Sequence, residues 1–192
     1  ILILSITWAH LAFNNFAVQS RLKQQIKKQF EHYLAPDMVA KLQKDPALLK
    51  LGGETRTMTF MFSDIRGFTP ISEKYKGNPA GLTRLINRFL TRMTDIIISN
   101  GGTIDKFMGD CIMAFCNAPL DMKDHANRAV KSAVEMQKEL KQLNKELKKE
   151  KLPEINIGIG INTGEALVGN MGSEQRFDYS VIGAVSYTHL RA

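Results

Sequence analysis

From residue 55 onward, the spacing of the apolar residues changes repeatedly between the period of a strand and that of a helix. Alternating apolar residues predict a first strand over 57–63. Apolar residues recur every three or four positions over 78–99 and 121–149, which predicts two long helices. Further strands are predicted at 103–107, 111–116, 154–162 and 165–169. The order βαββαβ with one extra strand predicts an α+β domain with the ferredoxin-like split βαβ topology.

Glycine, proline and capping residues predict where these elements end. Gly52-Gly53 predicts a break before the main domain. Thr69 is predicted to cap a short helix that begins at Pro70. Thr163-Gly164 predicts a turn between the last two strands, and Met108-Gly109-Asp110 a tight turn between the second and third strands.

The N-terminal segment has a different composition from the rest of the chain. Residues 1–18 hold 13 apolar residues and no charged residue. A basic cluster follows, made of Arg21, Lys23, Lys27 and Lys28. This order favours the end of a transmembrane helix over residues 1–19, with the main domain on the cytoplasmic side, and disfavours a signal peptide. An amphipathic docking helix remains the alternative, and residues 20–53 are predicted to form a helical linker.

Charge and cysteine content exclude two classes of protein. The chain carries 26 Lys and Arg against 19 Asp and Glu, but the lysines on the second long helix are spaced as a solvated face. Without an aromatic platform or groove-reading motif, no nucleic-acid partner is predicted. Cys111 and Cys116 are too few for a disulfide scaffold and are predicted to be core thiols. The four histidines share no metal-ligand spacing.

Two aspartates occupy complementary positions in the predicted topology. Asp64 ends the first strand, and Asp110 lies in the turn of the following hairpin. Since the first strand and the hairpin are antiparallel neighbours in a split βαβ sheet, the two carboxylates are expected to converge on a pair of Mg²⁺ or Mn²⁺ ions. Either aspartate alone would be interpreted as a capping or turn residue.

A phosphate-binding segment is predicted next to these carboxylates. Gly67 leaves the loop after Asp64 without a side chain, and the helix that follows Phe68 and Thr69 directs free backbone N–H groups toward it. Gly67, Phe68 and Thr69 are therefore candidate substrate-binding residues.

Three motifs together resemble the catalytic domain of class III adenylate/guanylate cyclases, in the form found in bacterial membrane-bound members. They are Phe62-Ser63-Asp64-Ile65-Arg66-Gly67-Phe68-Thr69, Gly101-Gly102 followed by Lys106-Phe107-Met108-Gly109-Asp110, and Gly160-Ile161-Asn162-Thr163-Gly164. The resemblance covers residues 54–183, which are assigned to an incomplete catalytic domain. It implies conversion of ATP to 3′,5′-cyclic AMP and pyrophosphate, in intracellular signalling.

The resemblance also implies roles for individual residues. Asp64 and Asp110 match the aspartates that bind two metal ions, and the Ile65 carbonyl matches a further ligand. Lys106 and Ser180 match the positions that read the adenine base, where guanylate cyclases favour Glu and Cys. The resemblance implies a homodimer in which each active site takes metal ligands from one chain and base contacts from the other.

The last residues depart from the family. Residues 184–192 read Ala-Val-Ser-Tyr-Thr-His-Leu-Arg-Ala, where the family has an Asp followed by a helix with an Asn and an Arg that stabilise the transition state. This aberrant tail predicts that the polypeptide as written is inactive. Three alternatives remain open: a catalytically silent regulatory or dimerisation module, a guanylate cyclase, and a cyclic-dinucleotide cyclase, whose Gly-Gly-Asp/Glu-Glu-Phe hairpin is absent from the sequence.

Overall fold

The computed structural model describes residues 13–21, 24, 51–173 and 175–183. The chain divides into two compact units, Ile1–Leu49 and Lys50–Ala192. In the first unit, residues 13–21 are helical, with Phe13 and Phe16 exposed. No helix within the described residues is both long enough and apolar enough to cross a membrane. Residues 1–12 of the predicted membrane segment, most of the predicted linker and the tail at 184–192 lie outside the described residues.

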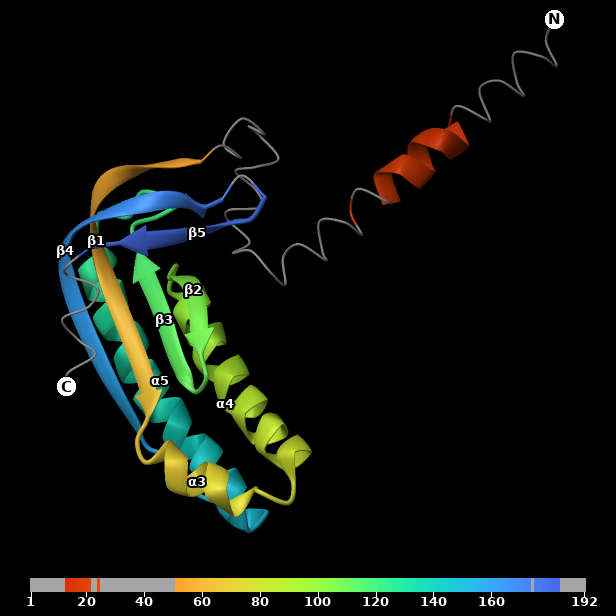
Figure 1. Cartoon of the computed structure of the whole chain (residues 1–192), viewed down its shortest axis with the longest axis vertical. Helices are drawn as coiled ribbons and strands as arrows, with labels where there is room; N and C mark the ends of the chain where they lie inside the picture. Colours follow the sequence, from red (N-terminus) through yellow and green to blue (C-terminus); the bar gives the residue numbers. More distant parts are fainter. Residues whose placement is uncertain (1–12, 22–23, 25–50, 174, 184–192) are drawn as a thin grey trace, which may run out of the picture. The chain divides into compact units, whose positions relative to one another are not determined.

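The second unit is a five-stranded antiparallel sheet with two long helices on one face (Figure 1). In chain order its elements are β1 (Gly52–Ile65), α3 (Phe68–Lys74), α4 (Pro79–Ser99), β2 (Thr103–Met108), β3 (Cys111–Cys116), α5 (His125–Lys149), β4 (Ile157–Gly172) and β5 (Phe177–Ile182). The strand order is β2-β3-β1-β4-β5. The ferredoxin-like topology predicted from the sequence is therefore confirmed. The extra strand beside β4 is β5, whereas the separate strand predicted at 165–169 is wrong, because these residues belong to β4.

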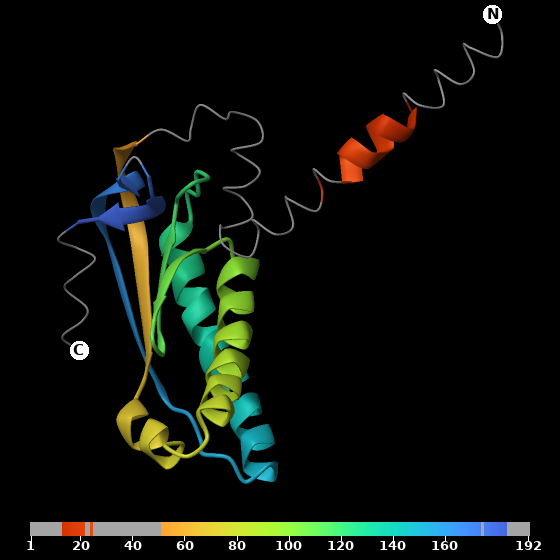
Figure 2. The ribbon, with the colours of Figure 1, turned by 45° about the vertical axis from the view of Figure 1, so that its right-hand side comes forward.

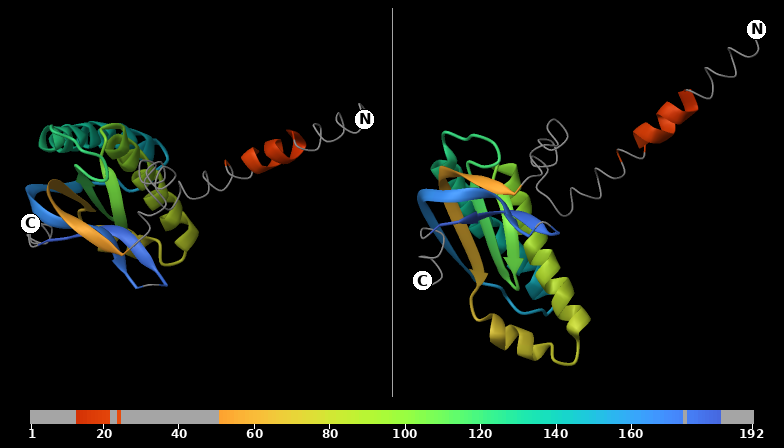
Figure 3. Two further views of the ribbon diagram at one scale, coloured as in Figure 1. Left: turned by 90° about the horizontal axis from the view of Figure 1, so that it is seen from above. Right: turned by 45° about the horizontal axis from the view of Figure 1, so that its top comes forward.

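Helices α4 and α5 lie side by side and bury their apolar stripes against the sheet (Figures 2 and 3). The fully buried residues include Phe89 and Met93 of α4 and Met136 and Leu143 of α5. On their outer sides the helices are joined by ion pairs between Arg88 and Arg92 of α4 and glutamates of α5, of which Glu146 contacts both arginines. Asn78 caps α4 by accepting a hydrogen bond from the Gly81 N–H, as expected for this residue type.

A second apolar cluster lies on the opposite face of the sheet. It contains Met58, Phe60 and Phe62 of β1 together with residues of β3, β4 and β5. Cys111 belongs to this cluster and Cys116 to the one under the helices, and both are free thiols. Both are buried, as predicted for core residues, and this burial raises the pKa of each thiol to about 11.

Several predicted boundaries are wrong. Gly52 and Gly53 are part of β1, where they pair with Asn170 and Gly169, so they do not form a break. Thr163-Gly164 is not a turn, because β4 runs straight through it and pairs there with Thr59 and Met58. Helix α5 begins at His125, four residues later than predicted.

The paired glycines Gly53 and Gly169 bring β1 and β4 unusually close. A Cβ at Gly169 would lie 2.1 Å from the Gly52 carbonyl oxygen and 2.4 Å from the Gly53 Cα. Since both contacts are with backbone, the strands must separate to accept a side chain. We expect Gly169→Ala to lower the free energy of unfolding by about 1–3 kcal/mol, as for other overpacked sites.

Urea unfolding of the two proteins measures this difference. Gly77→Ala is the matched control, because a Cβ at Gly77 would meet nothing within 4 Å. Equal stability of Gly169→Ala and Gly77→Ala would contradict the close packing of β1 on β4.

Candidate active site

The predicted pair of carboxylates meets where β1 ends beside the β2–β3 hairpin. Strand β1 pairs with β3 up to Ser63 and Ile112, which places Asp64 next to the hairpin turn. The backbone N–H of Ile65 donates a hydrogen bond to Asp110 Oδ2 at 3.2 Å. Asp64 and Asp110 are thus brought together from positions 46 residues apart, and the Ile65 main chain lies between them.

The electrostatics of this pair suit a bound cation. Burial raises the pKa of Asp110, and the neighbouring Asp64 carboxylate raises it further. Two like charges held together without a counter-charge are costly, and a divalent cation would relieve this repulsion. No group of three or more His, Cys, Asp or Glu that could hold a metal occurs among the described residues. Two carboxylates and a backbone carbonyl nonetheless fit Mg²⁺, which keeps several waters and takes substrate phosphates as further ligands.

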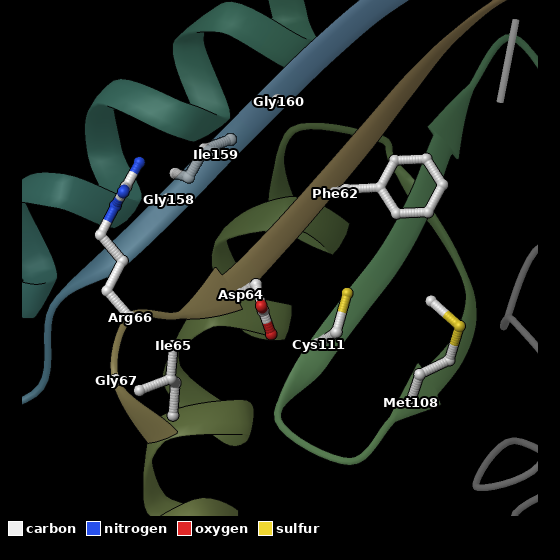
Figure 4. A pocket seen from close by; sticks show the side chains of 10 residues that line it. All are labelled: Phe62, Asp64, Ile65, Arg66, Gly67, Met108, Cys111, Gly158, Ile159 and Gly160. Carbon is white, nitrogen blue, oxygen red and sulfur yellow. The ribbon is translucent and has the colours of Figure 1, made fainter. Parts of the chain in front are cut away.

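A cleft of about 620 Å³ opens beside Asp64. Its walls come from the end of β1, the β2–β3 hairpin and the first part of β4 (Figure 4). Gly158 and Gly160 line it and pair directly with Asp64 and Phe62 across β1 and β4. Asp64 points toward β3, whereas Arg66 extends toward β4, where its guanidinium group lies over Gly158 (Figure 4).

Sequence reasoning missed Gly158 as a site residue. Its position opposite Asp64, which follows from strand register, is the signal that would have identified it.

The predicted phosphate-binding segment begins earlier than expected. Gly67 has a positive φ of 68° and precedes α3, which starts at Phe68. Thr69 therefore lies inside the helix, and its predicted capping role is wrong. Gly67 lines the cleft, whereas neither Phe68 nor Thr69 does. The role of these three residues in substrate binding stays a prediction.

The two predicted base-reading residues are in contact. Lys106 Nζ donates a hydrogen bond to Ser180 Oγ at 3.2 Å. Lys106 lies on β2 and Ser180 on β5, the two edge strands of the sheet. Strand β5 pairs with the last residues of β4, which pair with the first residues of β1, and there the sheet curls so that its edges approach each other (Figure 3).

A buried carboxylate that sequence reasoning missed adjoins this pair. The Asp105 side chain is 1% exposed, and its Oδ2 lies 3.4 Å from Lys106 Nζ. Burial raises the pKa of Asp105, while the Ser180 hydroxyl and the Lys106 ammonium partly offset this effect. Lys106, Ser180 and Asp105 do not line the cleft beside Asp64. One chain therefore carries a carboxylate cleft and a separate Lys–Ser–Asp cluster.

Comparison with known proteins agrees with this arrangement. Residues 53–188 match the adenylate and guanylate cyclase catalytic domain family. An adenylate cyclase of Anabaena cylindrica is 36% identical over 163 residues, which are 82% of this chain but only 30% of that protein. Adenylate cyclase 1 of Rhizobium meliloti is 32% identical over 126 residues, which are 66% of this chain and 19% of that protein.

Solved structures show the same fold. The guanylyl cyclase Cya2 is 44% identical, with a TM-score of 0.69 over 73% of this chain and 71% of that one. The adenylyl cyclase CyaB from P. aeruginosa is 39% identical, with a TM-score of 0.69 over 73% of this chain and 72% of that one. The family match, the fold and the aspartate pair agree, and the chain belongs to the class III adenylate/guanylate cyclase family, of which it carries a nucleotide cyclase catalytic domain.

Proposed function

We propose that this domain converts ATP to 3′,5′-cyclic AMP and pyrophosphate, in intracellular signalling, with two Mg²⁺ or Mn²⁺ ions. The observation that carries the proposal is the convergence of Asp64, which lines an open cleft, with the neighbouring Asp110. In the reaction the ribose 3′-oxygen forms a bond to the α-phosphorus, the bond to the pyrophosphate oxygen breaks, and the 3′-hydroxyl loses its proton.

The residues of the chain divide this work. Asp64, Asp110 and the Ile65 carbonyl would hold the ions, which supply a Lewis acid that favours loss of the 3′-hydroxyl proton and stabilises negative charge on the phosphates. The Ile65 N–H fixes Asp110 by its hydrogen bond. Gly67, next to Asp64, leaves room for the phosphates at the start of α3.

The choice of ATP over GTP rests on Lys106 and Ser180. Lys106 is a donor only and suits the unprotonated N1 of adenine, while Ser180 offers an oxygen to the amino group. Family membership does not decide the base, because Cya2 is a guanylyl cyclase and CyaB an adenylyl cyclase. The alternative of a silent regulatory module is disfavoured, since Asp64, Asp110 and Lys106 are all present.

The test uses a completed chain, in which residues 1–183 are joined to the C-terminal segment of the Anabaena cylindrica enzyme. We expect it to form cyclic AMP with Mg²⁺ or Mn²⁺. Lys106→Glu with Ser180→Cys should lower the ratio of kcat/KM for ATP to that for GTP by about 10²-fold or more, because hydrogen bonds to charged groups contribute about 1.5–3 kcal/mol each.

Lys141→Glu is the matched control, because it makes the same charge change on an exposed face of α5. An unchanged nucleotide preference in the double variant would mean that other residues read the base. No cyclic nucleotide from either triphosphate would refute the proposed function.

We further propose a homodimer with shared active sites. This is supported by the separation, within one chain, of the carboxylate cleft from the Lys106–Ser180 pair. Anchoring to a membrane, with the catalytic domain in the cytoplasm, is proposed from the apolar and basic pattern of residues 1–28.

A further inference from the structure

Asp105 lies at an irregularity of β2 that changes the direction of its side chain. Ile104 pairs with Ala114 and Lys106 with Met113, so Asp105 is an extra residue in the ladder, a β-bulge. In a regular strand, consecutive side chains point to opposite faces. A bulge redirects them, and here Asp105 Oδ2 comes within 3.4 Å of the neighbouring Lys106 Nζ.

The carboxylate is almost completely enclosed. Its side chain is 1% exposed, and no described residue donates a hydrogen bond to Oδ2. A buried charge is unfavourable unless it is paired. Lys106 is the cation with which it forms an ion pair, and the exposed Asp178 adds a further negative charge nearby. The Asp105 carboxylate therefore attracts the Lys106 ammonium and any hydroxyl that can donate to it.

The Ser180 hydroxyl is the group that needs such orientation. A hydroxyl both donates and accepts, so Ser180 by itself suits the 6-amino group of adenine and the 6-oxo group of guanine equally. Ser180 Oγ and Asp105 Oδ2 lie 3.2 and 3.4 Å from the same Lys106 Nζ. Oδ2 lacks a hydrogen-bond donor within the described part of the chain and an ionised carboxylate only accepts, so the nearby Ser180 hydroxyl is the group that can turn its proton toward it.

We propose that Asp105 is a positioning residue that sets the hydrogen-bond polarity of the base-recognition pair. It accepts a hydrogen bond from the Ser180 hydroxyl and pairs with the Lys106 ammonium, so that Ser180 presents a lone pair and Lys106 presents N–H groups. That pattern complements adenine, with its 6-amino donor and N1 acceptor, and opposes guanine, with its 6-oxo acceptor and N1–H donor. The inference rests on the proposed function and concerns the same site.

The experiment compares Asp105→Asn with the unchanged completed chain. We expect the ATP-to-GTP ratio of kcat/KM to fall about tenfold, through a higher KM for ATP and a lower KM for GTP, while kcat at saturating ATP stays within about twofold. Asp178→Asn is the matched control, because it removes a nearby charge that is exposed. It should leave the ratio unchanged.

Making the same Asp105→Asn change in a variant that lacks both base-reading side chains distinguishes a positioning role of Asp105 from a general effect on the structure. In Lys106→Met/Ser180→Ala, nothing is left for Asp105 to orient, so Asp105→Asn should not change the ratio further.

Calorimetric titration with ATP and with GTP measures the same preference as a ratio of binding constants, without turnover. If the completed chain makes no cyclic nucleotide yet loses its ATP preference in Asp105→Asn, the proposed function fails and the inference stands. The inference would be overturned if Asp105→Asn left the ATP preference unchanged in both kinetics and calorimetry. It would also be overturned if Asp105→Asn changed that preference equally in the completed chain and in Lys106→Met/Ser180→Ala.

Discussion

Asp64→Asn and Asp110→Asn are each expected to reduce cyclic AMP formation by the completed chain by at least about 10²–10³-fold, the loss typical of removing one preorganised stabilising group. Asparagine keeps the size of the side chain but loses the charge that a divalent cation requires. The structure adds a second expectation. Since burial and Asp64 raise the pKa of Asp110, removing either charge relieves repulsion, so neither variant should unfold more easily.

Product formation and thermal unfolding are measured on the same preparations. Asp95→Asn, which changes an exposed carboxylate on α4, is the control and should behave like the unchanged chain. Normal Mg²⁺-dependent activity in either site variant would remove that aspartate from the metal site.

Mn²⁺ binding provides a readout that is independent of turnover. A proton competes with the cation for Asp110, and the pKa of Asp110 is raised, so affinity should fall as pH is lowered through that pKa. In Asp110→Asn this part of the pH dependence should disappear.

The 192-residue polypeptide is expected to form no cyclic AMP above background, whereas the completed chain is expected to be active. Charge that develops on the phosphates in the transition state needs donors that are already in place. The resemblance assigns part of this task to an Asn and an Arg on a helix that residues 184–192 do not match. Loss of each such group costs about 10²–10³ in rate.

Nucleotide binding separates loss of chemistry from loss of folding. The 192-residue chain retains Asp64, Asp110 and Lys106, so weak binding of Mn²⁺–ATP should be measurable by calorimetry. Cyclic AMP formation by this chain at the rate of the completed one would require a new assignment of the groups that stabilise the transition state.

Local sequence was sufficient for the order of the elements up to β4 and for the aspartate pair, but not for β5. Helices α4 and α5 follow from apolar spacing, because a helix that packs on a sheet must present one apolar stripe. The proximity of Asp64 and Asp110 could be predicted, since the turn of an antiparallel hairpin must lie beside the end of the strand with which the hairpin pairs. This prediction needed only the pairing of β1 with β3, and not the packing of the side chains.

Local signals failed where long-range pairing dominates. Thr163-Gly164 has the composition of a turn, yet the continuous ladder with β1 holds it extended, because its backbone groups pair there with Thr59 and Met58. Thr69 and Pro70 have the composition of a helix start, yet Gly67, with its positive φ, lets α3 begin at Phe68.

The sequence by itself therefore determined the order of the elements up to β4, the family resemblance and the carboxylate pair. These follow from local periodicity, from motifs, and from the pairing of β1 with the following hairpin. Only the tertiary structure decided that Lys106 and Ser180, on opposite edges of the sheet, meet around Asp105. That contact depends on the β-bulge at Asp105 and on the curl of a sheet whose strands β1 and β4 approach closely at Gly53 and Gly169. Twist and bulges accumulate over several strands, so the position where two edges meet is a property of the whole sheet.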